Sequence, residues 1–139
     1  MKQKRKDKYK LRITRREAIY VHDEPDHSLS IVEMEGVPIE HKEGVAGKFV
    51  SRRSVTFHDR IKGAGPMQGY VIAMFQYGTV YSQFEGHRDS STKISSGTWK
   101  TYKGTGKLSG IKGNGTFKIA AGERPNEFIL DMEGEYDAG

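Results

Sequence analysis

Five ionisable side chains fall within the short segment VHDEPDH, residues 21–27: His22, Asp23, Glu24, Asp26 and His27. Two imidazoles and three carboxylates so close together could bind a divalent metal ion. The spacing matches no diagnostic ligand pattern, and Pro25 in the middle is typical of a turn. We therefore favour a solvated acidic turn and predict no metal site.

No other group of residues indicates catalysis. The chain has no cysteine, which excludes disulfides, thiolate chemistry and cysteine-based zinc or iron–sulfur sites. Ser82 is central in a predicted strand, but no histidine is clearly opposite it. His41, His58 and His87 lie in or beside predicted loops, where lone histidines are more often surface residues than catalytic ones. The sequence assigns no catalytic residue.

The segment GTGKLSGIKGNG, residues 104–115, holds five of the 17 glycines. It lacks the spacing of a phosphate-binding loop and of a dinucleotide fingerprint, so we predict no cofactor. Leu108 and Ile111 are spaced as in one buried helical turn, which a free linker would not need. We predict a compact corner in which both side chains close one end of the fold. Its residues are Gly104, Gly106, Leu108, Gly110, Ile111 and Gly113.

Alternation of apolar and polar residues is the dominant pattern of the chain, and helical periodicity is nearly absent. Turn-forming segments such as KGAGP and AGERPN separate the alternating stretches. This pattern predicts an all-β, antiparallel barrel or sandwich. The expected strands are Tyr9–Arg15, Ala18–His22, His27–Glu35, Gly47–Asp59, Gln68–Tyr77, Thr79–Glu85, Gly97–Tyr102, Gly115–Ala120 and Glu127–Tyr136.

The period of two also predicts which side chains face inward. Arg53 shares a face with Phe49, Val55 and Phe57, so we expect it inside, where an arginine needs a carboxylate partner such as Glu85. That pair could orient a ligand carboxylate or enolate, or be a structural bridge. A barrel of about eight strands can hold one small ligand. The candidate cavity residues are Arg53, Tyr70, Tyr81, Gln83, Glu85, Trp99 and Tyr136.

Charge is distributed unevenly along the chain. Residues 1–16 hold nine Lys or Arg and one acid, whereas the other 123 residues hold 14 Lys or Arg and 17 acids. We therefore divide the chain into a basic tail or first edge strand at 1–16 and a single β-barrel domain at 17–139. Nucleic-acid binding through the basic segment is an alternative function. The single aromatic residue in that run, Tyr9, offers little for base stacking, so we disfavour it.

No stretch is long and apolar enough for a membrane helix, and no apolar stretch follows the basic N-terminus. We therefore expect no membrane span. The composition fits a cytoplasmic protein, or an exported one whose leader has been removed. The segment QGYVIAMFQYG is apolar on both faces, which favours a second subunit covering its outer face.

The corner motif resembles that of the allene oxide cyclase and dirigent superfamily. The pattern G-[ST]-G-x-[FL]-x-G-[IV]-x-G is met by Gly104, Thr105, Gly106, Leu108, Gly110, Ile111 and Gly113. The segments FQYGTVYSQFEG and DMEGEYD also resemble this group, so the likeness covers about residues 68–137. It implies a calycin-like, eight-stranded antiparallel barrel of the allene oxide cyclase type, with an internal cavity and a dimeric or trimeric assembly.

The resemblance does not extend to the plant oxylipin cyclase reaction. The Pro- and Asn-bearing segment ahead of the first long strand is not recognisable, and the cavity cysteine of the plant enzymes is absent. We therefore predict binding of a small hydrophobic molecule in the barrel. A cofactor-free cyclase or isomerase, using a tyrosine, glutamate or arginine, is the alternative.

Overall fold

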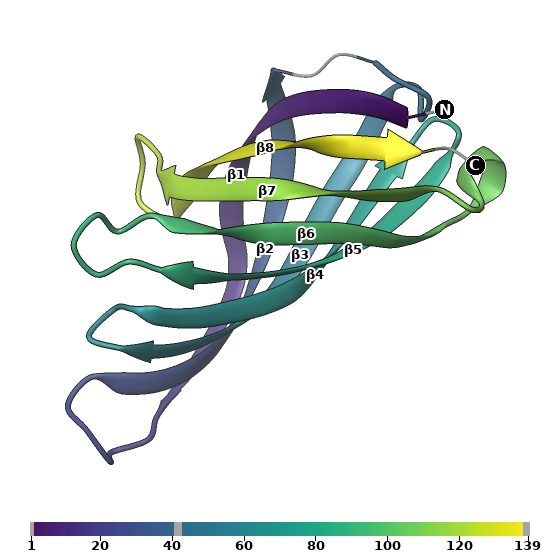
Figure 1. The fold of residues 1–139 in the computed structure, drawn as a ribbon. Coiled ribbons are helices and arrows are strands. Elements are labelled where there is room, and N and C mark those ends of the chain that lie inside the picture. The colour runs from purple at the N-terminus through teal and green to yellow at the C-terminus, as the bar shows by residue number, and fades with distance from the viewer. Residues whose placement is uncertain (1, 41–42, 138–139) are drawn as a thin grey trace.

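A computed structural model describes residues 2–40 and 43–137 (Figure 1). Eight strands and one short 3-10 helix make up this part of the chain. They are β1 Lys2–Tyr20, β2 His27–Glu40, β3 Phe49–Ile61, β4 Gly65–Phe75, β5 Gly78–Arg88, β6 Ser95–Gly104, η1 Gly106–Leu108, β7 Lys112–Ala121 and β8 Glu127–Asp137.

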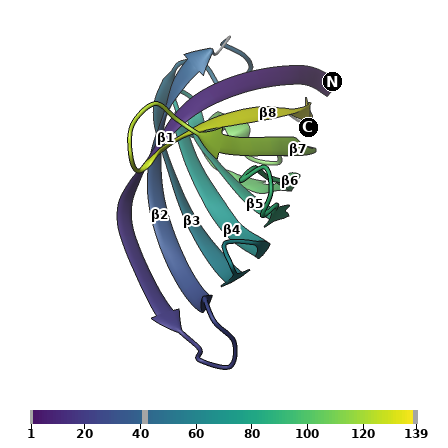
Figure 2. The same ribbon diagram turned by 90° about the vertical axis from the view of Figure 1, so that its left-hand side faces the viewer.

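The strands form a closed antiparallel barrel in simple sequence order. Each strand pairs with the next, and β1 closes the barrel by pairing Lys2–Arg12 with β8. Figure 2 shows β1 arching across the barrel, beside β8 in its first half and beside β2 in its second half. The prediction of an all-β, eight-stranded antiparallel barrel is confirmed.

The basic N-terminal segment belongs to the barrel wall. β1 runs from Lys2 through residue 16 to Tyr20, so residues 2–16 form most of the first strand. Alternate lysines of β1 face outward opposite the acids of β8: Lys2 pairs with Asp137, Lys4 with Glu135, Lys6 with Glu133 and Lys8 with Asp131. The positive charge of this segment is therefore set against an acidic neighbouring strand.

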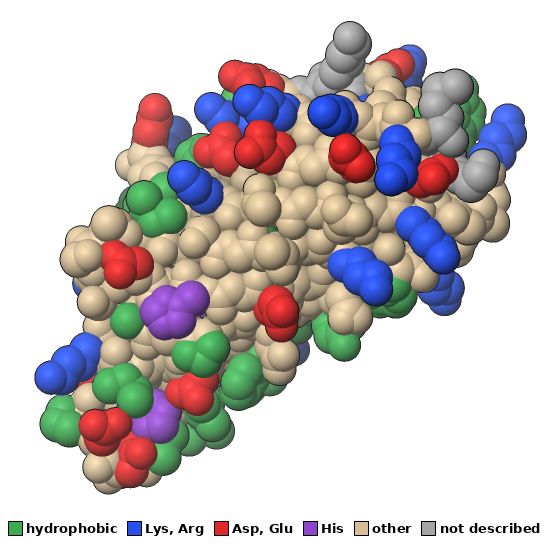
Figure 3. Space-filling model, viewed as in Figure 1, with side chains coloured by type: hydrophobic (Ala, Val, Ile, Leu, Met, Phe, Trp, Pro, Cys, Tyr) green, Lys and Arg blue, Asp and Glu red, His purple; other side chains and the backbone are tan. Residues whose placement is uncertain are grey.

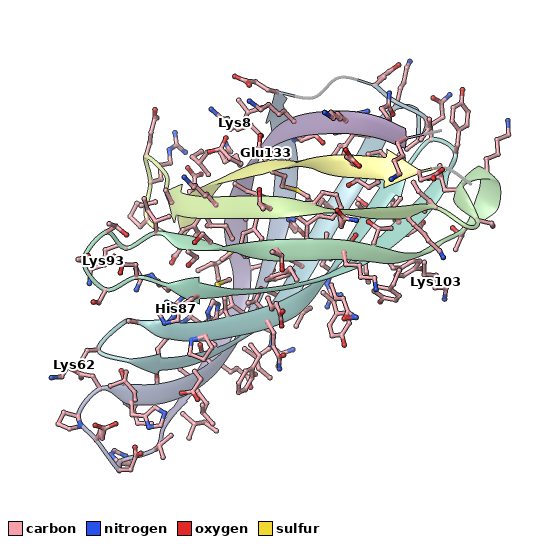
Figure 4. All side chains as sticks on the ribbon, viewed as in Figure 1. Lys8, Lys62, His87, Lys93, Lys103 and Glu133 are labelled. Carbon is pink, nitrogen blue, oxygen red and sulfur yellow. The ribbon has the colours of Figure 1, made fainter. Side chains whose placement is uncertain are left out.

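Figure 3 shows these basic and acidic side chains intermingled over β1 and β8. Figure 4 shows Lys8 and Glu133 on this outer face. Lys6 Nζ lies 3.7 Å from a Glu133 oxygen, and Lys8 Nζ lies 3.7 Å from an Asp131 oxygen. Such exposed pairs each stabilise a fold by about 0–1 kcal/mol. The main consequence of these ion pairs is that the positive charge of β1, which the sequence alone suggested would form a cationic patch, is neutralised by the acids of β8.

The two ends of the barrel differ. At one, here called the hairpin end, the chain turns at residues 21–26, 62–64, 89–94 and 122–126 (Figure 1). At the other, the η1 end, Leu108 and Ile111 are buried against Val80. Gly104 permits this packing, because a Cβ there would lie 2.1 Å from the Leu108 carbonyl oxygen. Gly110 has a φ of +84°, which also favours glycine. These residues close the η1 end.

Exposed apolar side chains gather on the outer face of β2, β3 and β4. Ile31, Phe57 and Tyr70 are exposed there, and the strand pairing places Ile31 directly opposite Phe57. Tyr70 packs edge to face on Tyr102, with ring centroids 6.3 Å apart. This face is an apolar surface that no other described part of the chain covers.

Candidate functional site: the barrel interior

The barrel encloses a cavity of about 320 Å³. Its residues come from every strand, because alternate side chains of each strand point inward. One part of the wall is apolar and aromatic, formed by Leu11, Val32, Met67, Phe84, Trp99, Phe117, Phe128 and Leu130. The volume lies in the range of small-molecule sites in proteins.

The wall contributed by β3 is polar along its whole length. Its inward side chains are Arg52, Ser54, Thr56, His58 and Arg60. The prediction that the face with Arg53 points inward is wrong. The Arg53 side chain is 51% exposed on the outer surface, and its Nε lies 2.7 Å from a Glu33 oxygen. A β-bulge between Phe49 and Ser51 causes the difference. Phe49 still packs on the core, but the extra residue reverses the alternation that follows.

The other predicted cavity residues divide between the two faces. Tyr70, Gln83 and Glu85 are exposed on the outer surface, and Tyr81 is half-buried there with Lys103 Nζ 5.0 Å from its ring centroid. The expected Arg53–Glu85 pair is not formed.

Trp99 does line the cavity and is 5% exposed. Tyr136 is inside but lies deeper, with its ring centroid 5.2 Å from that of Trp99, towards the η1 end.

Arg52 sits at the deep end of the polar wall and is 7% exposed. Its guanidinium carbon lies 5.2 Å from the Tyr9 ring centroid, and its Nη1 has no hydrogen-bond partner. Burial lowers the pKa of Arg52, and no ion pair links it to another described residue. Burial raises the pKa of Tyr9 to about 12 and also raises the pKa of Tyr136, so both phenols stay neutral.

A second basic group surrounds the cavity at the hairpin end: Arg16, His58, Arg60, Arg88 and Lys93. Arg60 Nη2 donates to His58 Nδ1 at 3.1 Å, and Arg88 Nη1 donates to the Gly63 carbonyl at 2.7 Å. Burial and the neighbouring arginines lower the pKa of His58 to about 3 and that of Arg60 to about 10. The side chains of Arg16 and Lys93 are exposed, so the cavity reaches the surface here. Figure 4 shows Lys93 in the turn at this end.

Sequence reasoning missed these interior basic residues. His58 was expected at the surface, yet it is 4% exposed inside the barrel. The missed residues share one signal in the sequence, since Arg52, Ser54, Thr56, His58 and Arg60 alternate with the apolar residues Val55 and Phe57. That signal indicates a two-faced strand without saying which face is inside.

The acidic turn holds no cluster of metal ligands. His27 Nδ1 lies 2.5 Å from an Asp23 oxygen and Nε2 lies 2.8 Å from an Asp59 oxygen, and these bonds raise the pKa of His27. In the described ranges 2–40 and 43–137, no group of three or more His, Asp or Glu side chains is arranged to bind a metal ion. The same ranges contain no helix with the length and apolar character needed to cross a membrane.

The fold and the cavity together define an eight-stranded antiparallel barrel with an interior cavity. A solved structure with a similar fold is AbnU, described as an exo-specific intermolecular Diels-Alderase, with a TM-score of 0.53, 11% identity and 99% of each chain covered. At this identity the likeness concerns the fold alone. Comparison of the sequence with protein-family models finds no match, and comparison with curated proteins finds no significant one.

Proposed function

We propose that this protein binds a small, largely hydrophobic molecule inside the barrel. The observation that carries the proposal is the cavity of about 320 Å³, which reaches the surface at the hairpin end and is closed by Leu108 and Ile111 at the other. Trp99, Phe84 and Phe117 give it an aromatic wall, and the β3 side chains supply polar groups that can orient a ligand. This combination is typical of small-molecule sites.

Filling the cavity is expected to weaken the binding of a neutral apolar probe. Ala73 lines the cavity on β4, and phenylalanine there would occupy ligand space. We expect Ala73→Phe to weaken binding of N-phenyl-1-naphthylamine by at least about tenfold, the loss of ~1.4 kcal/mol of contact energy. The measurement is quenching of Trp99 fluorescence, which is clean because the chain has one tryptophan.

The neighbouring residue offers a matched control. Ile72 is on the same strand and does not line the cavity, so Ile72→Phe should leave the affinity within about twofold. Loss of binding in both variants, or in neither, would contradict an interior site, and absence of binding to the unaltered protein would refute the proposal itself.

A second candidate function is a cofactor-free cyclase or isomerase. The fold likeness to AbnU, a Diels-Alderase, favours it, as does a cavity able to hold a reactive substrate in one folded conformation. His58, with its pKa near 3, is neutral at physiological pH, and the two inner tyrosines stay protonated. Catalysis here would rest on positioning and hydrogen-bond donation. We also propose, from the corner motif, distant kinship with the allene oxide cyclase and dirigent barrels.

Nucleic-acid binding through residues 1–16 receives less support. The outward lysines of β1 lie opposite Asp131, Glu133, Glu135 and Asp137 of β8, which would repel a phosphate backbone. Binding that weakens steeply with salt would be the signature of this alternative.

We further propose that the exposed apolar face of β2, β3 and β4 is covered by a second copy of the chain, in a dimer or trimer. A face centred on Ile31, Phe57 and Tyr70 can pair with itself about a symmetry axis. Tyr70→Glu is expected to shift the protein to monomer in sedimentation velocity, because it would place a charge in the interface core. The control Lys6→Glu, on the charged face of β1 and β8, should leave the assembly unchanged. A monomeric unaltered protein would contradict this proposal.

A further inference from the structure

The cavity has a strong charge asymmetry. It is lined by four arginines, one lysine and one histidine, and none of its described lining residues is an Asp or a Glu. The cations form two groups, with Arg52 deep inside and Arg16, Arg60, Arg88 and Lys93 at the hairpin end. A molecule entering the barrel therefore passes one basic group and reaches another.

Arg52 is the more unusual of the two groups, because burying a charge without a partner is costly. Its side chain is more than nine-tenths buried, and Nη1 points to no acceptor. The groups that act electrostatically on it are the phenols of Tyr9 and Tyr136. Both phenols stay neutral, so neither supplies a counter-charge.

The carboxylate of Asp7 does not balance the charge of Arg52. Asp7 on β1 is paired with Arg5, whose Nη2 lies 3.3 Å from the Asp7 oxygen. Contact with the Tyr9 ring offers Arg52 a cation–π interaction, which is worth much less than an ion pair to a desolvated guanidinium. A ligand with a negatively charged hydrogen-bond acceptor would give the Arg52 guanidinium the partner that the described residues do not supply.

We infer that the ligand is an acidic amphiphile, whose carboxylate or comparable single anionic group pairs with Arg52 while its apolar body lies against Trp99, Phe84 and Phe117. This inference rests on the proposed function, because it specifies the ligand class of the same cavity. A planar guanidinium binds a carboxylate by two parallel hydrogen bonds, which would satisfy Nη1 and neutralise the buried charge.

The basic group at the hairpin end has a complementary role. Arg60 Nε is also buried without a hydrogen-bond partner, and Arg16 and Arg88 lie close enough to lower the pKa of Arg60. Cations clustered at the mouth of a low-dielectric cavity attract anions and accelerate their entry. We expect this group to set the association rate and its salt dependence, whereas Arg52 sets the affinity.

The test compares two ligands that differ in charge and hardly in shape, dodecanoate and methyl dodecanoate. Both are titrated at pH 8 into the full chain loaded with N-phenyl-1-naphthylamine, and displacement is followed by fluorescence. The unaltered protein is expected to bind dodecanoate about 10- to 100-fold more tightly than the ester, the usual range for a hydrogen-bonded charge.

Arg52→Met removes the charge and keeps most of the side-chain volume. It should abolish the preference for the acid and leave the affinity for the ester within about twofold. Arg53→Met is the matched control, since Arg53 is the next residue and points outward, and it should retain the full preference. Arg52→Lys should retain part of it, because a lysine keeps the charge and loses the two-pronged geometry.

Thermal melting without ligand separates a binding role from a packing role. If Arg52 awaits an anion, Arg52→Met should raise the melting temperature, because it removes an uncompensated buried charge. A lower melting temperature together with an unchanged acid preference would show that Arg52 serves the fold and would overturn the inference.

Three further outcomes would contradict the inference or the proposed function. Equal affinity of the unaltered protein for acid and ester would refute an acidic ligand while leaving the cavity function in place. Loss of the preference in Arg60→Met but not in Arg52→Met would move the anion to the hairpin end and refute the assignment to Arg52. Failure of N-phenyl-1-naphthylamine itself to bind would overturn the proposed function, not this inference alone.

Discussion

Replacing Trp99 with alanine is expected to destabilise the barrel by about 3–5 kcal/mol, the usual cost of removing a large buried aromatic side chain. Trp99 is 5% exposed, packs against Tyr136 with its ring tilted by 33°, and donates from Nε1 to the Thr116 carbonyl at 3.1 Å. Its ring lies so close to Gly134 that a Cβ there would be 2.6 Å from Cζ2 of the indole. The surrounding strands are therefore fitted to this ring and cannot collapse into its space.

Urea unfolding monitored by far-ultraviolet circular dichroism measures this effect. Tyr102→Ala on the same strand is the control, because Tyr102 is 47% exposed on the outer face and should cost less than about 1 kcal/mol. Similar losses of unfolding free energy in the two variants would mean that the wall around Trp99 is not the tightly packed core described here.

The second large effect is acid destabilisation through His58. Its pKa in the folded protein is about 3 against an ordinary value of 6.5, because burial and the charges of Arg60, Arg16 and Arg88 disfavour the imidazolium. The unfolded chain therefore binds one more proton at this residue between these two pH values. The stabilisation is complete above pH 6.5 and is lost as the pH falls towards 3, with a total on the order of 5 kcal/mol.

Comparison with His58→Gln isolates this contribution. Glutamine can accept the Arg60 hydrogen bond but does not titrate, so the variant should lose less unfolding free energy between pH 6.5 and pH 3. Other groups titrate equally in both proteins. Hydrogen bonds from Ser91 and Thr92 lower the pKa of Asp89 to about 2, so the stabilisation from Asp89 is lost only at lower pH. The pKa of His27 is raised, so the stabilisation from His27 is lost as the pH rises. Parallel curves for the two proteins would contradict a buried neutral His58.

The architecture could be predicted from the sequence because it follows from local patterns. Alternation and turn residues indicate antiparallel strands. Burial of Leu108 and Ile111 follows from their spacing and the surrounding glycines. These features depend on residues that are neighbours in the chain.

The candidate site could be predicted only in part, because its faces depend on pairing between strands. On β3, the bulge after Phe49 reverses the alternation of inward and outward side chains. The sequence does not reveal this bulge, because the strand has one polar and one apolar face and either could point inward. The usual preference for apolar residues inside pointed to Val55 and Phe57, whereas the barrel has Arg52, His58 and Arg60 there. A binding site is where such a departure is expected.

The structure of the basic N-terminal segment was difficult to predict because it also depends on pairing between strands. Its nine Lys and Arg residues suggest a solvated tail when the segment is considered alone. Pairing with β8, more than 110 positions away in sequence, supplies the opposing acids and makes the segment a strand. Charge that is unbalanced locally is balanced by the closure of the barrel, which no local pattern encodes.

The most direct test of the interior site is a crystal structure of the protein with dodecanoate. The account predicts electron density along the cavity, with the carboxylate within hydrogen-bond distance of Arg52 and the alkyl chain against Trp99. A ligand bound on the outer face of β2, β3 and β4, with the cavity filled by protein side chains alone, would contradict it.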